Sequence, residues 1–496
     1  MLTLGIPAAC AIFLLSLFLR LLLGIIIDSR RLRRFPTPSL WATTPFWLMY
    51  HNLKGRRFLA VDEAHERLGS VVRISSNHIS FSDPKAFKQI YNFGGAVVKD
   101  DFYETIAEGN PSMAQTSSKV EHAAKRRNMA HVFSAQQIRA VERRIQQIVQ
   151  KLCRNVALTS QGLAVGPDDQ YSVENGAFDL RPWMNMFSYD AITSIFWSNS
   201  YGFLDRGSDI CMTQLASGEV KAVHAMDSYH SAVHFNAWLA HLPRGWYNFG
   251  RKILRHHHGQ RAGAYFSGMA RWLVQERLKT TVKEPDLFSA LPVTASEKRP
   301  NPMTLDQIHA ECTTMLDAGN DTTQTSLISY ERSAPPYESL QQVPYLRACL
   351  DESFRLRTPS GFGLPRKDVE SGVCIAGYEI APGTTVSGPL YTLHRNESLF
   401  GKAHSFIPER WLLDQNEVFQ TSEEERQNLK DHVLPFSLGS RACIRRNLAY
   451  MELSIVIAAL VMSFEWEMAE PDAEMVSCER FNYSPKELFV RCRRLP

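Results

Sequence analysis

The segment FSLGSRACIRRNLAYMEL, residues 436–453, constrains the fold of this chain more than any other. It places Cys443 just before residues 447–464, which are apolar on nearly all sides, as in a deeply buried helix. At the start of such a helix, free backbone N–H groups and the helix dipole lower a thiol pKa and favour thiolate. Arg441 adds positive charge, and Gly439 permits a tight turn close to a flat ligand. The segment therefore predicts either a metal-bound thiolate or a small buried hydrophobe, and these residues alone leave both open.

The bulk composition narrows the class of protein. With 496 residues, 44% of them hydrophobic and 21% charged, the chain is long enough to bury a large globular core. The formal net charge of +4 is small and no run interleaves arginine with aromatic residues, so we expect no nucleic-acid partner. The nine cysteines include no CxxC pair, which argues against a disulfide framework and a structural zinc site. A reducing compartment fits this cysteine usage best.

Residues 1–27 form a separate apolar segment that only Arg20 interrupts. About 20 apolar residues cross the hydrocarbon core of a bilayer, and a long charged side chain near one end can snorkel to the headgroups. Four arginines between residues 30 and 34 would stay on the cytosolic face. We therefore expect a single-pass membrane anchor, with a cleaved signal peptide as the alternative. Residues 28–41, which are basic and contain the sequence FPTPS, predict a hinge after the anchor.

Residues 42–496 are expected to form one large domain that is mainly α-helical with small β-sheets. Alternating residues and turn signals predict a hairpin over residues 70–83 and a second β-rich region over residues 372–393. Apolar residues at helical spacing predict a helix over residues 136–153, and residues 181–197 are a more buried helix candidate. Thr304 and Gln307 form a plausible capping box for a helix over residues 305–329. We find no internal repeat and no linker between two large domains.

The stretch Phe436-Ser-Leu-Gly439-Ser-Arg441-Ala-Cys443 resembles, residue for residue, the haem-binding signature of the cytochrome P450 family. The resemblance implies that Cys443 is the axial ligand of the iron in haem b, that Phe436 shields its sulfur and that Arg441 pairs with a haem propionate. An anionic thiolate pushes electron density onto iron and favours O–O cleavage. The resemblance covers nearly the whole chain and implies a P450 fold, with a single haem-binding domain behind the anchor.

Three further patterns follow in the order typical of that family. In AGNDTT, the resemblance implies an O2 groove at the helix glycine and a proton relay through Asp321 and Thr322, although these residue types often merely follow a helix glycine. In ESFR, Glu352 and Arg355 have i, i+3 spacing, and FIPERW supplies Arg410. The resemblance implies a buried Glu–Arg–Arg cluster, whereas such a pair is ordinarily a solvated surface contact.

Two more matches concern the haem propionates. In EHAAKRRNMAHVFS, His122 and Arg126 resemble the family pattern on the helix that contacts the propionates. In GLPR, Arg366 stands where the family commonly has a cationic propionate partner. The resemblance therefore implies that these three residues belong to the cofactor site.

The sequences YTLHRN and NLAYMEL are typical of fungal members, such as benzoate hydroxylases, that oxidise small aromatic compounds or act in secondary metabolism. The implied function is a monooxygenase that inserts one oxygen atom of O2 into an apolar small molecule. Its implied partner is an NADPH-cytochrome P450 reductase. Arg127 and Arg446 could bind an acidic surface of that reductase. The implied location is the endoplasmic reticulum membrane, with the catalytic domain facing the cytosol. The substrate has no readable code in the sequence, and a largely apolar pocket is the expectation.

Two features depart from the family pattern. Arg445 stands where the family nearly always has glycine, and we expect its long stem to splay outward from a different helix face. Thr322 and Glu352 lie only 30 positions apart, and the Pro-Pro pair at 335–336 excludes one continuous helix between them. Segment 328–340 is therefore abnormally short, and we expect core surface near it to be exposed.

These departures motivate an alternative function. The chain would then be a membrane-anchored P450 relic without monooxygenase activity, or a sequence with a misassigned exon boundary. A third possibility, a haem-thiolate isomerase or dehydratase, is disfavoured by the intact Asp–Thr pair.

Overall fold

The computed structural model describes residue 28 and residues 30–92, 97–107, 110–168, 173, 176–282, 284, 286–293, 302–326, 336–368, 372–413, 422–470 and 475–496. For residues 320–326 it describes the backbone only, and the side chain of residue 483 is also left out. The predicted anchor over residues 1–27 lies outside the described residues, as does much of the abnormally short segment.

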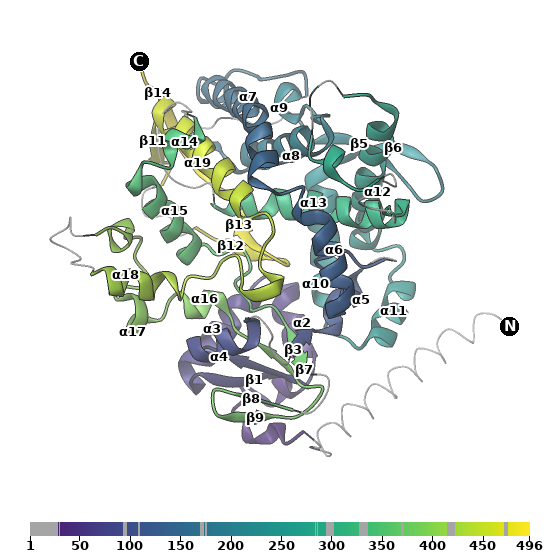
Figure 1. The fold of residues 1–496 in the computed structure, drawn as a ribbon, viewed down its shortest axis with the longest axis vertical. Coiled ribbons are helices and arrows are strands. Elements are labelled where there is room, and N and C mark those ends of the chain that lie inside the picture. The colour runs from purple at the N-terminus through teal and green to yellow at the C-terminus, as the bar shows by residue number, and fades with distance from the viewer. Residues whose placement is uncertain are drawn as a thin grey trace.

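Helices dominate the fold and the sheets are small, as predicted (Figure 1). The predicted helix over residues 136–153 is α7, and the one over residues 181–197 is α8, which is buried on nearly all sides because apolar residues surround it. The larger helices are α2 (Phe46–Leu53), α3 (Arg57–Leu68), α4 (Pro84–Tyr91), α6 (Lys119–Ala130), α7 (Ala135–Ser160), α8 (Arg181–Trp197), α10 (Ala225–Leu239), α11 (Arg244–Ile253), α12 (His258–Lys279), α13 (Leu305–Ser326), α15 (Pro344–Leu356), α18 (Glu423–Lys430) and α19 (Arg446–Ser463). The shorter ones are α5 (Asp101–Ile106), α9 (Phe203–Arg206), α14 (Tyr337–Leu340), α16 (Leu390–Leu393) and α17 (Glu397–Phe400).

The largest sheet lies with α3 and α4 at the lower end of the molecule in Figure 1. Its strand order is β1-β2-β10-β7-β3, and the predicted hairpin over residues 70–83 forms its antiparallel β1–β2 edge, with Val71 opposite Phe81. The strands are β1 (Val71–Ser75), β2 (His78–Phe81), β3 (Val97–Lys99), β4 (Phe178–Asp179), β5 (Ile210–Gln214), β6 (Val220–His224), β7 (Arg366–Asp368), β8 (Val373–Ile375), β9 (Tyr378–Ile380), β10 (Thr385–Ser387), β11 (Phe464–Met468), β12 (Ser477–Glu479), β13 (Tyr483–Pro485) and β14 (Phe489–Arg494).

The predicted hinge over residues 28–41 packs against this sheet instead of standing free of it. Leu32 and Phe35 are buried in the apolar cluster that also contains Ile79 and Phe81. Arg30 donates a hydrogen bond from Nη1 to Asn77 Oδ1 at 2.7 Å, at the turn of the β1–β2 hairpin. This segment therefore fixes the entry of the chain onto the folded body.

Two long helices position the functional site. A capping box begins α13, because the backbone N–H of Thr304 donates to Gln307 Oε1 at 2.9 Å and the N–H of Gln307 donates to Thr304 Oγ1 at 3.3 Å. Helix α19 packs against α7 and α13, and 67% of its 18 residues are buried within the protein. Among the described residues it is the one helix long and apolar enough to span a membrane, but its burial is that of a core helix.

Between α13 and α15, the described residues contain only the single turn of α14. The side chain of Leu340 is buried in the main core, and the backbone N–H of Tyr337 donates to Glu142 Oε1 of α7 at 2.9 Å. Val343 and Tyr345 remain exposed just beyond this turn. Helix α14 thus packs against α19 within the segment that we predict to be abnormally short.

Candidate functional site

A cavity of about 700 Å³ lies between α13 and the loop that precedes α19. The loop contributes Phe436, Arg441 and Cys443, while α13 contributes Thr314 and Ala318. Aromatic side chains from distant parts of the chain form other walls, namely Phe102, Phe266 and Phe481. The topology thus brings the cysteine motif and the AGNDTT helix to the same space.

The loop holds Cys443 at the cavity surface. The backbone N–H of Cys443 donates to the carbonyl oxygen of Phe436 at 2.8 Å, which closes the loop. The loop reverses through two left-handed residues, Ser437 with φ 60° and Gly439 with φ 66°, so the predicted tight turn at Gly439 is present. The Cys443 side chain is open to the cavity although the protein encloses the site.

The electrostatics of Cys443 differ from the sequence expectation. Burial raises the pKa of its thiol above the usual value, and this desolvation outweighs the hydrogen bond from the Arg445 backbone N–H and the charges of Arg445 and Arg126, which lower it. The helix start alone therefore does not produce a thiolate, because the desolvation of a buried anion is the larger effect. A metal cation in contact with the sulfur reverses this balance, since a coordinating thiol loses its proton outright.

Phe436 forms an aromatic cluster behind the loop. Its ring centroid lies 5.0 Å from that of Phe354 on α15 and 5.4 Å from that of Tyr450 on α19. Because Phe436 also lines the cavity, its ring stands between the Cys443 loop and the helices behind it. This position can exclude water from the sulfur.

Five cationic or basic side chains gather at one end of the cavity. Arg441 and Lys99 line it. The other three, which the resemblance assigns to the cofactor site, lie close enough for electrostatic interaction with these two, namely His122, Arg126 and Arg366. Arg441 donates from Nη1 to the Thr116 carbonyl at 2.8 Å. Lys99, on β3, was missed by sequence reasoning because a single lysine in the short strand VVK carries no recognisable motif.

These side chains repel one another. Burial, together with Arg366 and Arg441, lowers the pKa of Lys99 well below its usual value. Burial and Arg366 lower the pKa of Arg441 to about 10, and burial, followed by Arg441 and Lys99, lowers that of His122 to about 4. Glu121, whose carboxylate opposes the lowering of the Arg441 pKa, is 43% exposed and forms an ion pair with Lys125 at 2.8 Å. The uncompensated charge suits a ligand with acidic groups.

Arg126 joins the cation cluster to the cysteine loop. It donates from Nη1 to the carbonyl oxygen of Ala442 at 2.8 Å, one residue before Cys443. Arg366 donates to the Pro365 carbonyl at 3.1 Å and lies with its guanidinium 5.0 Å from the ring centroid of Tyr91. These two arginines are therefore held by protein groups on the cavity's outer side.

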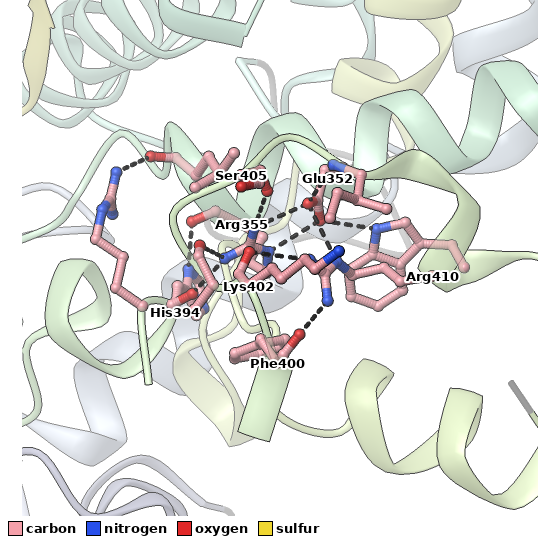
Figure 2. A network of polar contacts seen from close by, with 12 residues as sticks. Glu352, Arg355, His394, Phe400, Lys402, Ser405 and Arg410 are labelled. Carbon is pink, nitrogen blue, oxygen red and sulfur yellow. Dashed lines mark hydrogen bonds and ion pairs between the residues drawn. The ribbon is translucent and has the colours of Figure 1, made fainter. Parts of the chain in front are cut away.

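The predicted Glu–Arg–Arg cluster is assembled and fully buried (Figure 2). Glu352 Oε1 accepts from Arg355 Nη2 at 2.8 Å and from Arg410 Nε at 3.1 Å, and Oε2 accepts from Trp411 Nε1 at 3.0 Å. Arg355 also donates to the His394 and Ala403 carbonyls, each at 2.6 Å. The structure therefore replaces the alternative of a solvated surface pair with a buried network that ties α15 to the segment before the cysteine loop.

The helix with the AGNDTT motif is continuous through Gly319 to Ser326, so the expected interruption at the glycine is absent from its described backbone. Gly319 instead allows close packing, because a Cβ there would lie 2.8 Å from Ile192 Cγ1 and 3.0 Å from Arg445 Nη2. The side chains of Asp321 and Thr322 lie outside the described residues.

Arg445 does not splay outward, contrary to the sequence expectation. Only 7% of its surface is exposed, and Nη1 donates to the carbonyl oxygen of Met315 on α13 at 3.1 Å. The reason is its place as the N-cap of α19, where the chain faces α13 and not solvent. Its Nε atom is buried and has no hydrogen-bond partner among the described residues.

Glu452 is a second buried residue that the sequence reasoning missed. It lines the same cavity as Arg445 and is 2% exposed. Burial raises the pKa of its carboxyl to about 7, although the Arg445 charge opposes this rise. A glutamate among apolar helix residues carries no local signal, so only the packing of α19 against α13 identifies it.

The donor set of this cavity fits haem. An accessible cysteine sulfur is the ligand that haem-thiolate iron needs, the cation cluster suits two propionates, and the aromatic and aliphatic walls suit a porphyrin. Arg445 adds a buried Nε–H group that has no hydrogen-bond partner within the described part of the chain, at the same cavity.

Comparisons with known proteins agree with this geometry. The cytochrome P450 family model matches residues 38–330 and 326–490, and the two pieces meet where the chain is abnormally short. Benzoate 4-monooxygenase bphA of Aspergillus niger is 28% identical over 94% of each chain. Cytochrome P450 monooxygenase btcC of Neocamarosporium betae is 27% identical over 95% of this chain and 94% of its own. Among solved structures, the cytochrome P450 CYP102L1 has a TM-score of 0.68 with 18% identity and covers 93% of this chain and 99% of its own, which supports the fold.

Proposed function

This chain belongs to the cytochrome P450 monooxygenase family, and on that premise we propose that it inserts one oxygen atom of O2 into a small, largely apolar molecule as a membrane-anchored, haem-dependent enzyme. The observation that carries the proposal is the placement of Cys443 at a cavity that also has a cluster of cationic side chains at one end. Haem b, when bound, supplies the iron chemistry that activates O2.

The residues of the cavity would hold the haem, exclude water and move protons. Cys443 would hold the iron, and Phe436 with its aromatic neighbours keeps water from the sulfur. Lys99 and Arg441 would bind the propionates, with Arg126, Arg366 and His122 adding positive charge or N–H groups behind them. Asp321 and Thr322 are our candidates for moving protons into the cavity during oxygen activation.

We further assign the substrate to the class of small aromatic compounds. One relative is named a benzoate 4-monooxygenase, and others are named cytochrome P450 monooxygenases of fungi. The aromatic side chains of Phe102, Phe266 and Phe481 in the cavity wall support an aromatic or apolar substrate.

The electron donor we propose is an NADPH-cytochrome P450 reductase at the endoplasmic reticulum membrane. Arg127 and Arg446 are exposed, as a docking surface for an acidic partner requires. The apolar residues 1–27 and the arginines after them support a single-pass anchor with the catalytic domain in the cytosol.

Product analysis with labelled oxygen tests this function. The full chain is placed in phospholipid vesicles with a fungal NADPH-cytochrome P450 reductase, NADPH, ¹⁸O2 and a panel of benzoates and larger aromatic compounds. We expect at least one product that carries a single ¹⁸O atom, formed only when reductase and NADPH are both present.

The alternative is a P450 relic without monooxygenase activity. A folded protein that binds haem but yields neither NADPH consumption nor labelled product with any compound would contradict the proposal and support that alternative. Conversion of a hydroperoxide substrate without NADPH would instead indicate an isomerase or dehydratase.

A further inference from the structure

Arg445 places a buried cation beside the cysteine that would hold the iron. It stands two positions after Cys443, its side chain is 7% exposed, and its guanidinium is tied to the Met315 carbonyl of α13 at 3.1 Å. Cys443 and Arg445 line the same cavity and lie close enough for their charges to interact. A glycine at this position would place no charge there.

The charge of Arg445 is only partly neutralised. Among the described side chains, no carboxylate oxygen lies within 4.0 Å of its nitrogens. The acids that act on it from farther away are Glu452 and Asp317, and Asp317 already accepts a hydrogen bond from the Tyr229 hydroxyl at 2.7 Å. Arginine keeps its proton at neutral pH even when buried, so the guanidinium remains a permanent positive charge.

We propose that Arg445 makes the haem iron of this chain easier to reduce, by placing a permanent positive charge next to the Cys443 thiolate. The inference rests on the proposed function, because it concerns the one-electron step in which ferric iron accepts an electron from the flavoprotein reductase. That step changes the site by one negative charge, with no bond made or broken. A nearby positive charge stabilises the form with the extra electron, and the effect is strong where water is excluded.

A purely structural role is the competing explanation. The bond from Arg445 to the Met315 carbonyl also ties α19 to α13, so its loss could disturb the site without any electrostatic effect. Glu452 separates the two explanations, because its carboxylate opposes the Arg445 charge from the same cavity. If charge is the cause, removing Arg445 and removing Glu452 shift the reduction equilibrium in opposite directions.

The experiment is a spectroelectrochemical titration of the haem-loaded full chain at pH 8, where most Glu452 carboxyls are ionised. Arg445→Gln is expected to lower the equilibrium constant for reduction by about tenfold, which is ~59 mV for one electron. Arg445→Lys should stay within about threefold of the wild type because it keeps the charge. Glu452→Gln is expected to shift the constant upward.

Arg139→Gln is the control, since it removes an arginine that is exposed to solvent on the first turns of α7 and has no place in the proposed site. Water and salt screen its charge, so we expect a change below about threefold. The inference is overturned if Arg445→Gln matches the wild type, if Arg139→Gln has the same effect as Arg445→Gln, or if Glu452→Gln and Arg445→Gln shift the constant in the same direction. If Arg445→Gln does not retain haem, the sign of the Glu452→Gln shift decides.

Failure of the proposed function gives a different result. A wild-type chain that does not produce the red-shifted Soret band of thiolate-ligated ferrous haem with carbon monoxide would refute the proposed function itself. Haem binding by Arg445→Gly but not by the wild type would overturn the inference, since Arg445 would then block the site.

Discussion

Lys99 is a buried cation at the cavity, next to two further cations. It is buried on β3, its ammonium lies 4.2 Å from the ring centroid of Tyr103, and Arg366 and Arg441 repel it. Such an arrangement costs free energy in the folded protein unless a ligand brings acidic groups. The site is therefore suited to a ligand whose acidic groups offset the positive charge of Lys99, Arg366 and Arg441.

Replacing Lys99 with methionine should weaken haem binding. A charge-assisted hydrogen bond contributes about 1.5–3 kcal/mol, so we expect the dissociation constant to rise by about 10- to 100-fold. The measurement is a titration of the haem-free protein with haem, followed at the Soret band. Lys119→Met, on the exposed first turn of α6, is the control and should bind like the wild type. Equal affinity of the two variants would argue against a role for Lys99.

His65 gives a prediction for pH. It donates from Nδ1 to the Gly69 carbonyl at 2.9 Å, its Nε2 lies 2.8 Å from Ser80 Oγ, and burial lowers its pKa to about 4. Because the unfolded chain has the higher histidine pKa of about 6.5, it binds the proton first as pH falls. His65 therefore contributes stability above pH 6.5 that is lost progressively down to about pH 4.

The comparison is between the wild type and His65→Gln in urea unfolding at pH 7 and pH 5. Between pH 7 and pH 5 the wild type should lose about 2 kcal/mol more unfolding free energy than His65→Gln, because only the wild type has the buried histidine. A difference that stays constant between these two pH values would contradict the assignment.

Individual residues were predictable only where a motif carries them. Short patterns predicted the Glu352 cluster, which is assembled and buried. They also predicted cofactor roles for Cys443 and Phe436; both residues line the cavity, and their roles stay predictions. The direction of Arg445 was predicted incorrectly, since it depends on how α19 meets α13. Lys99 and Glu452 carry no local signal, and their roles emerge only from the cavity they share with Cys443.

At the scale of elements, the Glu352 network connects α15 to the segment that leads into the cysteine loop (Figure 2). Glu352, Arg355 and Arg410 are each at most 1% exposed. A buried guanidinium that loses its carboxylate keeps its desolvation cost without compensation. The network therefore locks the elements on one side of the cavity.

Glu352→Gln is expected to destabilise the protein by about 3–5 kcal/mol, because two buried arginines lose their charged partner. Chemical denaturation monitored by circular dichroism measures this change. Glu423→Gln is a matched control, since Glu423 has the same i, i+3 spacing to Arg426 but is 62% exposed. It should unfold like the wild type, and similar losses in both variants would show that burial does not set the energy.

The elements themselves were more predictable than their contacts. Helices α7 and α8 and the β1–β2 hairpin appear where periodicity places them, because each presents an apolar face or stripe to the core. The predicted break at Gly319 does not appear in the described backbone, where the glycine serves close packing against Ile192 and Arg445. Periodicity predicts an element well, but it does not predict which neighbour that element will meet.

At the scale of the whole molecule, the proposed anchor and the catalytic domain should be separable. A chain that lacks residues 2–27 should leave the membrane fraction for the soluble fraction, because it loses the long apolar segment before the fold. It should keep the carbon monoxide spectrum of the full chain, since Leu32 and Phe35 still pack on the sheet. Sedimentation of membranes after a carbonate wash measures the partition, and a truncated chain that stays in the pellet would contradict this division.

The structure of the connection between α13 and α15 could not be predicted in full from the sequence. The family match also divides there, at residues 326–330. The sequence predicts that segment 328–340 is abnormally short and that Pro335 and Pro336 prevent one continuous helix there, and both stay predictions. That α14 would bury Leu340 in the core could not be predicted, because four residues carry too little periodicity to assign a face.

All of the proposed chemistry depends on the sulfur of Cys443 binding haem iron. The most direct test is the carbon monoxide difference spectrum of the reduced full chain, with Cys443→Ser compared against the wild type and against Cys374→Ser, which alters an exposed cysteine far from the loop in sequence. We predict a red-shifted Soret band in the wild type and in Cys374→Ser, and its complete loss in Cys443→Ser. An unchanged band in Cys443→Ser would contradict the claim.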